Sequence, residues 1–488
     1  MKQAEFFSSR WALILAALGM AIGTGNIWRF PRIAAQNGGG SFLIPWVIFL
    51  FLWSIPLLII EFTMGKETRR GTVGAFGKFI GKKFTWMGAF VGFCTMAIMF
   101  YYSVVMGWCL KYFAATFWGG DGLSDTQAFW VSFTSSSEPI FFHLLAVIAA
   151  AMVIFKGVVS GIEKANKILI PLLLGLLLLA AGRALTLDGA IAGLNYLFEP
   201  HLEQLLNYKT WLEALSQSAW STGAGWGLIL TYAVYMQKRE GVVLNSFVAG
   251  LGNNSASLLA GMVLFPAVFA LAPEIGLDPT QVMAESGPAS TGMTFIWIPR
   301  LFANMPAGSF FMGVFFLALT TAALSSLIAM FELSTRIFMD AGLERHKAIL
   351  FVGSCSFLLG LPSAMSLDFF GNQDWVWGLG LIISGMFFTF AALKYGVERM
   401  RTNLINAEGN DMAAGRWFNF IVAIIIPIEF VVLISWWSFQ AVTSYDPAGW
   451  WNPFRTFSLG TCLFQWVVAI GIFVFLNNRL FDWTVRET

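Results

Sequence analysis

The sequence predicts an all-α polytopic membrane protein with 12 membrane-spanning helices. Of its 488 residues, 57% are hydrophobic and only 11% are charged, whereas about a quarter of the residues in a soluble chain are charged. The hydrophobic residues gather in runs long enough to cross a bilayer, which takes about 20 residues in a helix. The charges are too few to cover a water-exposed surface, so we expect the lipid bilayer to be the solvent of this chain.

The expected spans follow one another with short linkers, and neither a soluble domain nor a low-complexity tail interrupts them. Charged, Gly-rich or Pro-rich segments end each hydrophobic run. The approximate spans are 11–34, 41–65, 87–116, 141–157, 166–184, 210–237, 242–271, 308–338, 347–364, 374–395, 417–437 and 457–477. Because their number is even, both termini are expected on the same side of the membrane.

The charges between the spans predict the orientation. The loop after the second span is crowded with Lys66, Arg69, Arg70, Lys78, Lys82 and Lys83, whereas segment 112–139 after the third span has no Lys or Arg. Short cytoplasmic loops carry an excess of Lys and Arg, so the first of these loops and both termini are expected in the cytoplasm. Basic residues after spans four and six agree with this orientation. The longer polar connections, 272–307 and 438–456, then fall outside.

Composition and motifs exclude several functions. The 29 Lys and Arg residues nearly balance the 27 Asp and Glu residues, so the basic surface that binds nucleic acid is not expected. The four cysteines lie inside hydrophobic runs and show neither a disulfide framework nor zinc-ligand spacing. No His/Glu metal cluster, serine nucleophile constellation, phosphate loop or cleavable signal peptide is apparent. We therefore do not expect an enzyme.

Two of the expected spans contain helix-breaking residues in mid-membrane. The first holds Gly19, Gly23, Gly25 and Asn26, and the sixth holds Ser221-Thr222-Gly223-Ala224-Gly225. A lone Gly in a span more often serves close helix packing. Here both breaks fall in the first span of a group of five, which is the pattern of inverted repeats whose broken helices form a midplane binding site. Freed backbone persists there only where it lines a cavity or binds something, so we expect substrate and ions.

Several motifs together identify a resemblance. The run Gly23-Thr24-Gly25-Asn26-Ile27-Trp28-Arg29-Phe30-Pro31, followed by Gln36-Asn37-Gly38-Gly39-Gly40, resembles the first-helix signature of the neurotransmitter:sodium symporter family. Further matches follow in order at Ile55-Pro56 to Glu61, Met64-Gly65, Tyr101-Tyr102, Gln217 to Gly227, Asn253, Leu324-Ser325-Ser326 and Asp374. They cover essentially the whole chain.

The resemblance implies a fold and an activity. Residues 1–488 would form one transporter domain with the fold of the family's bacterial leucine transporter, a 5+5 inverted repeat in which helices one and six are broken. The repeats would cover about 11–184 and 210–395, and two additional helices would follow at about 417–477. The implied activity is sodium-coupled, secondary-active uptake of a neutral amino acid by alternating access. Each inward charge gains about 2.3 kcal/mol per 100 mV, which can drive accumulation of a neutral substrate.

Two sodium sites are implied, both built from neutral oxygens, which suit a hard cation. The first would use the backbone of Ala21, the side chains of Asn26, Ser221 and Asn253, and the substrate carboxylate. The second would use backbone oxygens of Gly19, Ile22 and Ala322 with the hydroxyls of Ser325 and Ser326. Each Ser or Asn alone more often makes an interhelical hydrogen bond worth about 0.6 kcal/mol. Their joint occurrence at the two breaks favours ion sites.

The implied substrate site lies between the breaks. It comprises Met20, Ala21, Gly23, Thr24, Gly25, Tyr102, Val105, Trp220, Ser221, Gly223, Trp226 and Met330. A substrate carboxylate would lie against the half-helix amides of Thr24 and Gly25 and the Tyr102 hydroxyl. Monoamine carriers of the family place an Asp at position 23, so Gly23 favours an amino acid. The bulk of Trp226 hints at a small neutral substrate, although Gly223 could return volume to a larger one.

The gates of the family rest on fixed charges. Outside, Arg29 would pair with Asp374, and Tyr102 and Trp220 would close beneath them. Inside, Tyr235 and Asp340 match the inner gate. The usual Arg and Trp before the first span are replaced by Ala4 and Phe7. Either Lys2 or Arg10 would then pair with Asp340, or the gate would be weaker.

Position 257 bears on chloride. Many bacterial relatives carry a Glu there, whose charge offsets the nearby sodium, and a neutral Ser257 suggests that a mobile chloride supplies it. The candidate ligands are Trp46, Gln217, Ser221, Asn253 and Ser257. Trp46 replaces the usual Tyr, and its indole is larger and differently placed, so chloride dependence stays open.

The sequence therefore indicates a sodium-coupled symporter in the plasma (inner) membrane. Its expected partners are a neutral amino acid and the lipid bilayer, with no nucleic acid, and the chain would act as a monomer or homodimer. Two alternatives stay open. An ion channel would need a continuous polar pore, and a receptor on a transporter scaffold would bind the ligand without counterflow.

Overall fold

A computed structural model describes residues 5–118, 125–286, 291–407 and 411–485, and these residues are helical without a strand. Within these described residues, ten helices are long and apolar enough to cross a membrane. They are Gly40–Thr68, Lys82–Phe117, Glu138–Phe155, Val158–Ala184, Val242–Glu274, Gly308–Asp340, Arg345–Met365, Leu367–Tyr395, Trp417–Tyr445 and Leu459–Val485. Several extend beyond the predicted spans because a helix continues past the hydrocarbon core into the polar boundary.

The other two predicted spans are broken. The first consists of α1 (Arg10–Ala21) and the pair α2 (Thr24–Ile27) and α3 (Arg29–Gln36), with a bend of 64°. The sixth consists of α13 (Tyr208–Ser221) and α14 (Leu228–Ala233), with residues 222–227 between them. The two breaks therefore fall in the two spans where the sequence predicted them.

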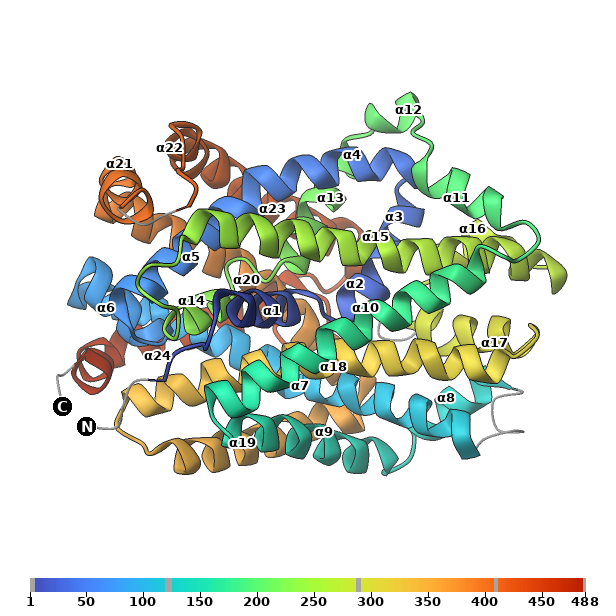
Figure 1. Cartoon of the computed structure of the whole chain (residues 1–488), viewed down its shortest axis with the longest axis horizontal. Helices are drawn as coiled ribbons and strands as arrows, with labels where there is room; N and C mark the ends of the chain where they lie inside the picture. The colour runs from blue at the N-terminus through green and yellow to red at the C-terminus, as the bar shows by residue number, and fades with distance from the viewer. Residues whose placement is uncertain (1–4, 119–124, 287–290, 408–410, 486–488) are drawn as a thin grey trace.

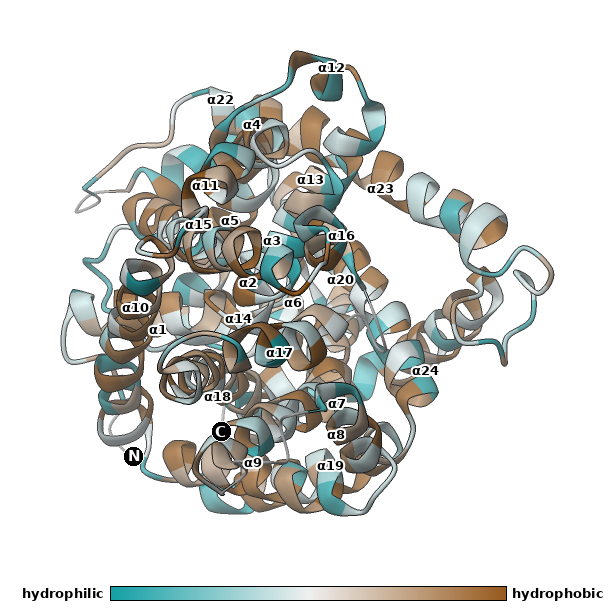
Figure 2. Ribbon diagram, turned by 90° about the vertical axis from the view of Figure 1, so that its right-hand side faces the viewer, coloured by the Kyte–Doolittle hydropathy of each residue, from teal (hydrophilic) through white to brown (hydrophobic). Residues whose placement is uncertain are grey.

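The long helices enclose these breaks. In Figure 1, α1, α2 and α14 lie among α7 (Thr85–Trp118), α15 (Val242–Glu274), α18 (Gly308–Asp340) and α20 (Leu367–Tyr395). The end-on view of Figure 2 places α23 (Ile426–Gln440) and α24 (Leu459–Val485) at the periphery. The break segments are thus shielded from lipid, which satisfies the requirement for non-helical backbone at membrane depth.

Short helices occupy several of the predicted linkers. They are α6 (Thr72–Ile80), α8 (Thr126–Thr134), α11 (Ala190–Phe198), α12 (Leu202–Leu205), α16 (Pro279–Ala284), α17 (Ile298–Ala303) and α21 (Val397–Met400). Local capping begins two of them. Asp125 accepts a hydrogen bond from the Ala128 amide at 3.0 Å, and Asp278 accepts from the amides of Thr280 and Gln281. Aspartate at the N-cap satisfies amides that have no intrahelical partner.

Three further helices complete the bundle, namely α9 (Glu138–Phe155), α10 (Lys164–Ala184) and α19 (Arg345–Met365). Helix α10 continues a π-helical segment, Val158–Glu163, so this span begins earlier than predicted. The early start brings Glu163 into the helix, where Ser8 and Lys167 contact its carboxylate. The start of α1 and the end of α24 lie at the same end of the molecule (Figure 1).

Candidate functional site

The break in span one is a capped turn. Helix α1 ends at Ala21, and α2 begins at Thr24 after two residues of extended backbone. The Gly23 amide donates to Asn26 Oδ1 at 2.9 Å, so the side chain of Asn26 holds the start of the second half-helix. The backbone oxygens at the end of α1 are consequently free of the ordinary helical ladder and face the neighbouring spans.

The break in span six depends on glycine. Gly223, Gly225 and Gly227 have φ angles of 70°, 87° and 79°, a left-handed region that side chains disfavour. Glu61 of α5 (Ile55–Thr68) braces this segment by accepting hydrogen bonds from the Gly225 amide at 2.5 Å and the Leu230 amide at 3.4 Å. Glu61 was not predicted as a site residue, although an acid inside a hydrophobic span signals function.

The residues predicted for the first sodium site form one network. Asn26 Nδ2 lies 2.8 Å from Asn253 Oδ1, 2.8 Å from Ser257 Oγ and 3.4 Å from Ser221 Oγ. The same Asn253 amide atom also lies beside the backbone oxygens of Ala21, at 3.0 Å, and Ser221, at 3.1 Å. Oxygens at this spacing repel one another unless a donor or a cation lies among them.

The chemistry of this network suits sodium. Its ligands are amides, hydroxyls and carbonyls, which are hard and carry no net charge. Within the described ranges, no group of three or more His, Cys, Asp or Glu side chains is placed to hold a metal ion. The structure therefore brings Ala21, Asn26, Ser221 and Asn253 together, and their role as sodium ligands stays a prediction.

The second predicted sodium site is partly assembled. Ser326 Oγ donates to the carbonyl oxygens of Gly19, at 3.4 Å, and Met20, at 3.3 Å. Ser325 Oγ lies 3.0 Å from the Ala322 carbonyl. These contacts join α18 to the end of α1. Ile22 lies in the adjoining break, and no hydrogen bond links it to either serine.

Tyr102 lies at the start of the second half-helix. Its hydroxyl accepts from the Thr24 amide at 3.2 Å and contacts Thr24 Oγ1 at 3.3 Å. A Cβ atom on Gly23 would lie 3.1 Å from this hydroxyl and 3.0 Å from Ser326 Oγ, whereas a Cβ on Gly25 would meet no atom within 4 Å. Gly25 thus leaves open space beside the amides at a helix N-terminus, a setting that favours an anionic group, whereas Gly23 permits the close approach of Tyr102 and Ser326.

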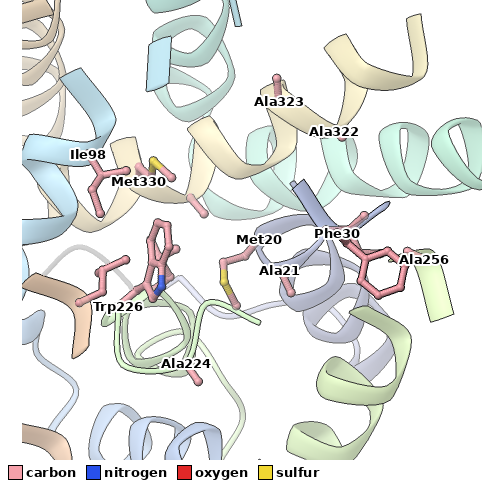
Figure 3. Close-up of a cluster of buried hydrophobic side chains, with 14 of the residues drawn as sticks. Met20, Ala21, Phe30, Ile98, Ala224, Trp226, Ala256, Ala322, Ala323 and Met330 are labelled. Carbon is pink, nitrogen blue, oxygen red and sulfur yellow. The ribbon is translucent and has the colours of Figure 1, made fainter. Parts of the chain in front are cut away.

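The predicted apolar wall is buried as one cluster. Met20, Val105, Trp226 and Met330 are each less than a tenth exposed, and Figure 3 shows Met20, Trp226 and Met330 together with Ile98 of α7. Ile98 was missed because an isoleucine in a hydrophobic span carries no sequence signal. Gly223 does not leave free volume here, because a Cβ on it would lie 2.6 Å from Met20 Sδ. Met20 fills the space beside Gly223 that was predicted to accommodate a larger substrate.

The outer charges are close but not paired. Arg29 lies over the Trp220 ring, 4.9 Å from its centroid, and contacts Ser216 Oγ at 3.4 Å. No ion pair joins it to Asp374, whose carboxyl lies beside Tyr101 instead. The prediction of a direct Arg29–Asp374 pair is therefore wrong for this structure. The cation–π contact provides an alternative partner for the guanidinium.

The inner charges form two linked groups. Asp340 contacts Arg336 at 2.8 Å, Arg70 at 3.9 Å and the Gly71 amide at 2.6 Å. Tyr235 donates to Glu332 at 2.6 Å, and Arg345 contacts Glu332 at 2.5 Å. Arg336, Glu332 and Arg345 were not predicted as gate residues. Their signal was the presence of charge within and directly after a hydrophobic span.

The described part of the N-terminal tail, from Glu5 onward, supplies no ion-pair partner to Asp340. Arg10 forms an ion pair with Asp411 and donates to Asn245 at 3.2 Å, so its predicted pairing with Asp340 is wrong. The alternative, Lys2, lies outside the described residues, as does Ala4. Phe7 packs edge-on against Tyr232 and Tyr235, with ring centroids 6.0 and 6.4 Å apart.

Three of the five candidate chloride ligands lie together. Ser221, Asn253 and Ser257 belong to the network around Asn26. Gln217 lies one turn before Ser221 on α13, and its Oε1 atom has no hydrogen-bond partner among the described residues. The Trp46 indole nitrogen is also unpartnered, and its ring lies 4.5 Å from that of Phe30.

Comparison with known proteins decides the family. The model of the sodium:neurotransmitter symporter family matches residues 4–132 and 132–480. The chain belongs to this family. It is a multi-pass membrane protein and a sodium-coupled transporter, and not an enzyme.

The symporter has relatives among archaea and bacteria. An uncharacterized sodium-dependent transporter of Methanocaldococcus jannaschii is 31% identical over 453 residues, which are 88% of this chain and 89% of the relative. An uncharacterized sodium-dependent transporter of Bacillus subtilis is 30% identical over 458 residues, covering 89% and 98% of the two chains. Both descriptions agree with the predicted dependence on sodium.

A solved structure confirms the fold class of the symporter. The crystal structure of MhsT in complex with L-phenylalanine matches with a TM-score of 0.77 and 30% identity, covering 89% of this chain and 99% of that chain. The predicted all-α fold of the bacterial leucine transporter, with helices one and six broken, is thereby confirmed. The roles of the individual site residues and the bounds of the two repeats stay predictions.

Proposed function

We propose that this symporter imports a small neutral amino acid by alternating access, driven by two sodium ions and assisted by chloride. The main support for this proposal is the carboxylate seat, the predicted binding site for the substrate carboxylate beside Tyr102 and the start of α2. Gly25 leaves room beside the amides of the half-helix, and Gly23 lets the Tyr102 hydroxyl approach them closely. This hydroxyl accepts from Thr24 while its own proton is available to the substrate. MhsT, a structural relative, was crystallised with an amino acid, L-phenylalanine, which supports the same class of substrate.

The size of the substrate follows from the apolar wall. Met20 lies directly against Gly223, and Trp226 is 8% exposed. Both bulky side chains reduce the space between the two breaks, which favours a small side chain on the substrate. The ammonium of a zwitterion would then face the carbonyls of span six and the backbone near Ala21.

The balance of charge in the proposed site supports the binding of two sodium ions and one chloride. Two sodium ions would enter a region whose proposed ligands, from Gly19 to Ser326, include no acid. The substrate carboxylate would offset one of the charges, and a chloride among Trp46, Gln217, Ser221, Asn253 and Ser257 would offset the other. A buried charge without compensation is costly, so the ions and the substrate would bind together.

We place the protein in the plasma (inner) membrane, with both termini in the cytoplasm. The basic residues after spans two, four and six support this orientation. The chain would act as one transport domain, with repeats at about 11–184 and 210–395 and two additional helices after them.

A thermal-stability screen tests the substrate. The purified symporter is heated with each of the twenty amino acids, in sodium or in potassium salts. A substrate at 100 times its Kd stabilises the folded state by about 2.7 kcal/mol, so a small neutral amino acid should raise the melting temperature in sodium alone. If no amino acid stabilises in a sodium-dependent way, the proposed substrate class is wrong.

Transport itself is tested in proteoliposomes. We expect accumulation of the radiolabelled amino acid against its gradient, together with counterflow, which neither a channel nor a binding-only receptor performs. Replacing chloride by gluconate should reduce the uptake. Unchanged uptake in gluconate would refute the chloride part of the proposal and leave the sodium part standing.

A further inference from the structure

The eleventh span carries a buried acid that no described side chain or amide contacts. Glu429 lies near the centre of the span Trp417–Tyr445 and is 5% exposed. Both oxygens of its carboxyl group are buried without a hydrogen-bond partner in the described part of the chain. It plays no part in the proposed transport site.

Other buried acids in the spans have partners. Glu61 accepts from two backbone amides, Glu332 contacts Arg345 and Tyr235, and Asp340 contacts Arg336. Each of these acids thus has a hydrogen-bond donor or a cation beside its carboxyl oxygens. Glu429 differs from these acids in environment, although it has the same chemistry.

Glu429 faces protein and not lipid. The buried residues of its helix recur at helical spacing, at Val422, Ile426, Glu429, Leu433 and Trp436. This face packs against α20, α13 and the π-helical segment Leu50–Ser54 of span two. Figure 2 shows α23 on the outside of the bundle, so these elements lie on its inner side.

No charge on the neighbouring elements compensates Glu429. The titratable groups of α13 and α20 are Tyr208, Lys209, Glu213, Asp368, Asp374, Lys394 and Tyr395, and segment Leu50–Ser54 has none. None of them forms a hydrogen bond with the Glu429 carboxyl, both oxygens of which are unpartnered among the described residues. An ionised carboxylate alone in such a medium is strongly disfavoured, and binding a proton removes its charge.

We propose that Glu429 is a proton-binding site of this symporter, occupied at neutral pH and sealed by the packing of α23 against α13 and α20. Release of the proton to water would leave a carboxylate in the interface between α23 and the helices α13 and α20. Because α13 carries Trp220 and Ser221 of the transport site, the occupied proton site helps to hold the outer half of span six in place. The packing of α23 against α13 and α20 is therefore more stable at low pH than at high pH.

Infrared spectroscopy of the purified full-length protein tests the bound proton directly. A protonated carboxyl group in an apolar site has a carbonyl stretch that is distinct from that of a carboxylate and shifts in D₂O. We expect this band in the wild type at neutral pH, its loss in Glu429→Gln, and its retention in Glu203→Gln, which makes the same change on an exposed helix. A Glu429→Gln spectrum identical to that of the wild type would overturn the proposal.

The pH dependence of stability provides a second test. The folded state keeps a proton that the unfolded chain releases above a pH of about 4.3. Raising the pH therefore costs stability until folded Glu429 ionises, by up to about tenfold in the unfolding equilibrium per pH unit. The difference in melting temperature between wild type and Glu429→Gln should shift with pH in this direction, and a difference that does not vary with pH would contradict the site.

A second substitution separates protonation from packing. Glu429→Leu also removes the titrating group but keeps an apolar side chain, so it serves if the glutamine variant is unstable. Both variants should keep sodium-dependent uptake, because Glu429 touches neither the proposed ions nor the substrate. If the leucine variant retained the carbonyl band or the pH dependence of the wild type, Glu429 would not be the proton-binding group.

Discussion

The indole of Trp220 lies so close to Gly378 that a Cβ atom on Gly378 would fall 1.9 Å from two of its ring carbons. Gly378 belongs to α20 and Trp220 to α13, so this contact fixes the distance between the helix that carries Asp374 and the outer half of span six. The Arg29 guanidinium lies over the same ring, which is also edge-on to the ring of Trp226, with the centroids 6.5 Å apart. The position of the Trp220 ring, which is part of the predicted outer lid, therefore depends on the absence of a side chain at Gly378.

We expect Gly378→Ala to displace this lid. The added methyl group cannot be accommodated by a rigid indole, and overpacking of this kind costs about 1–3 kcal/mol. Substrate affinity should fall by about 5- to 100-fold in a binding assay. The matched control is Gly471→Ala in α24, where a Cβ would meet no atom within 4 Å. Equal affinities of the two variants would show that the lid does not control binding.

Asn26→Ala should abolish sodium-coupled uptake. The side chain contacts Ser221, Asn253 and Ser257 through Nδ2 and holds the Gly23 amide through Oδ1, so its removal dismantles both the ion site and the half-helix cap. Uptake in a sodium gradient is the measurement. Asn403→Ala, at an exposed position, should transport normally. Retained sodium dependence in Asn26→Ala would refute the first ion site.

Tyr102→Phe should weaken binding of substrates that carry a carboxylate. A hydrogen bond to a charged group contributes about 1.5–3 kcal/mol, so the KM should rise about 10- to 100-fold. Tyr208→Phe, on an exposed side chain, is the control and should leave the KM unchanged. An unchanged KM in Tyr102→Phe would remove the tyrosine from the carboxylate seat.

Arg336→Met should impair the inner gate more than Arg10→Met. Arg336 is the closer partner of buried Asp340, and removing one member of a buried ion pair costs about 3–5 kcal/mol. The more exposed Arg10–Asp411 pair contributes about 0–1 kcal/mol. Uptake rates and melting temperatures of the two variants provide the comparison. The reverse order would restore Arg10 as the main gate residue.

Ser257→Glu should make uptake independent of chloride. Ser257 Oγ lies 2.8 Å from Asn26 Nδ2, so a carboxylate at this position would place fixed negative charge beside the first sodium site. Uptake by this variant should be the same in chloride and in gluconate. Ser257→Gln has the same size without the charge and should keep the response of the wild type. If both variants respond to chloride alike, the anion does not act at this position.

Most of the helical architecture could be predicted because a bilayer imposes a local rule. Every spanning helix must be about 20 residues long and mostly apolar, and this holds before any tertiary contact forms. The breaks in spans one and six were also predictable from their glycines. The brace from Glu61 and the wall residue Ile98 were not, because their roles depend on which helix faces the break.

The sequence by itself determined the fold class, the broken spans and the neutral, oxygen-rich character of the proposed ion sites, since these follow from residue types and their spacing. Only the tertiary structure decided which partner each charged side chain takes. Arg29 lies over Trp220 and not against Asp374, Arg10 contacts Asp411, and Asp340 contacts Arg336. Ion pairs act over a few ångströms between helices that are distant in sequence, so their choice depends on helix packing, which no local pattern records.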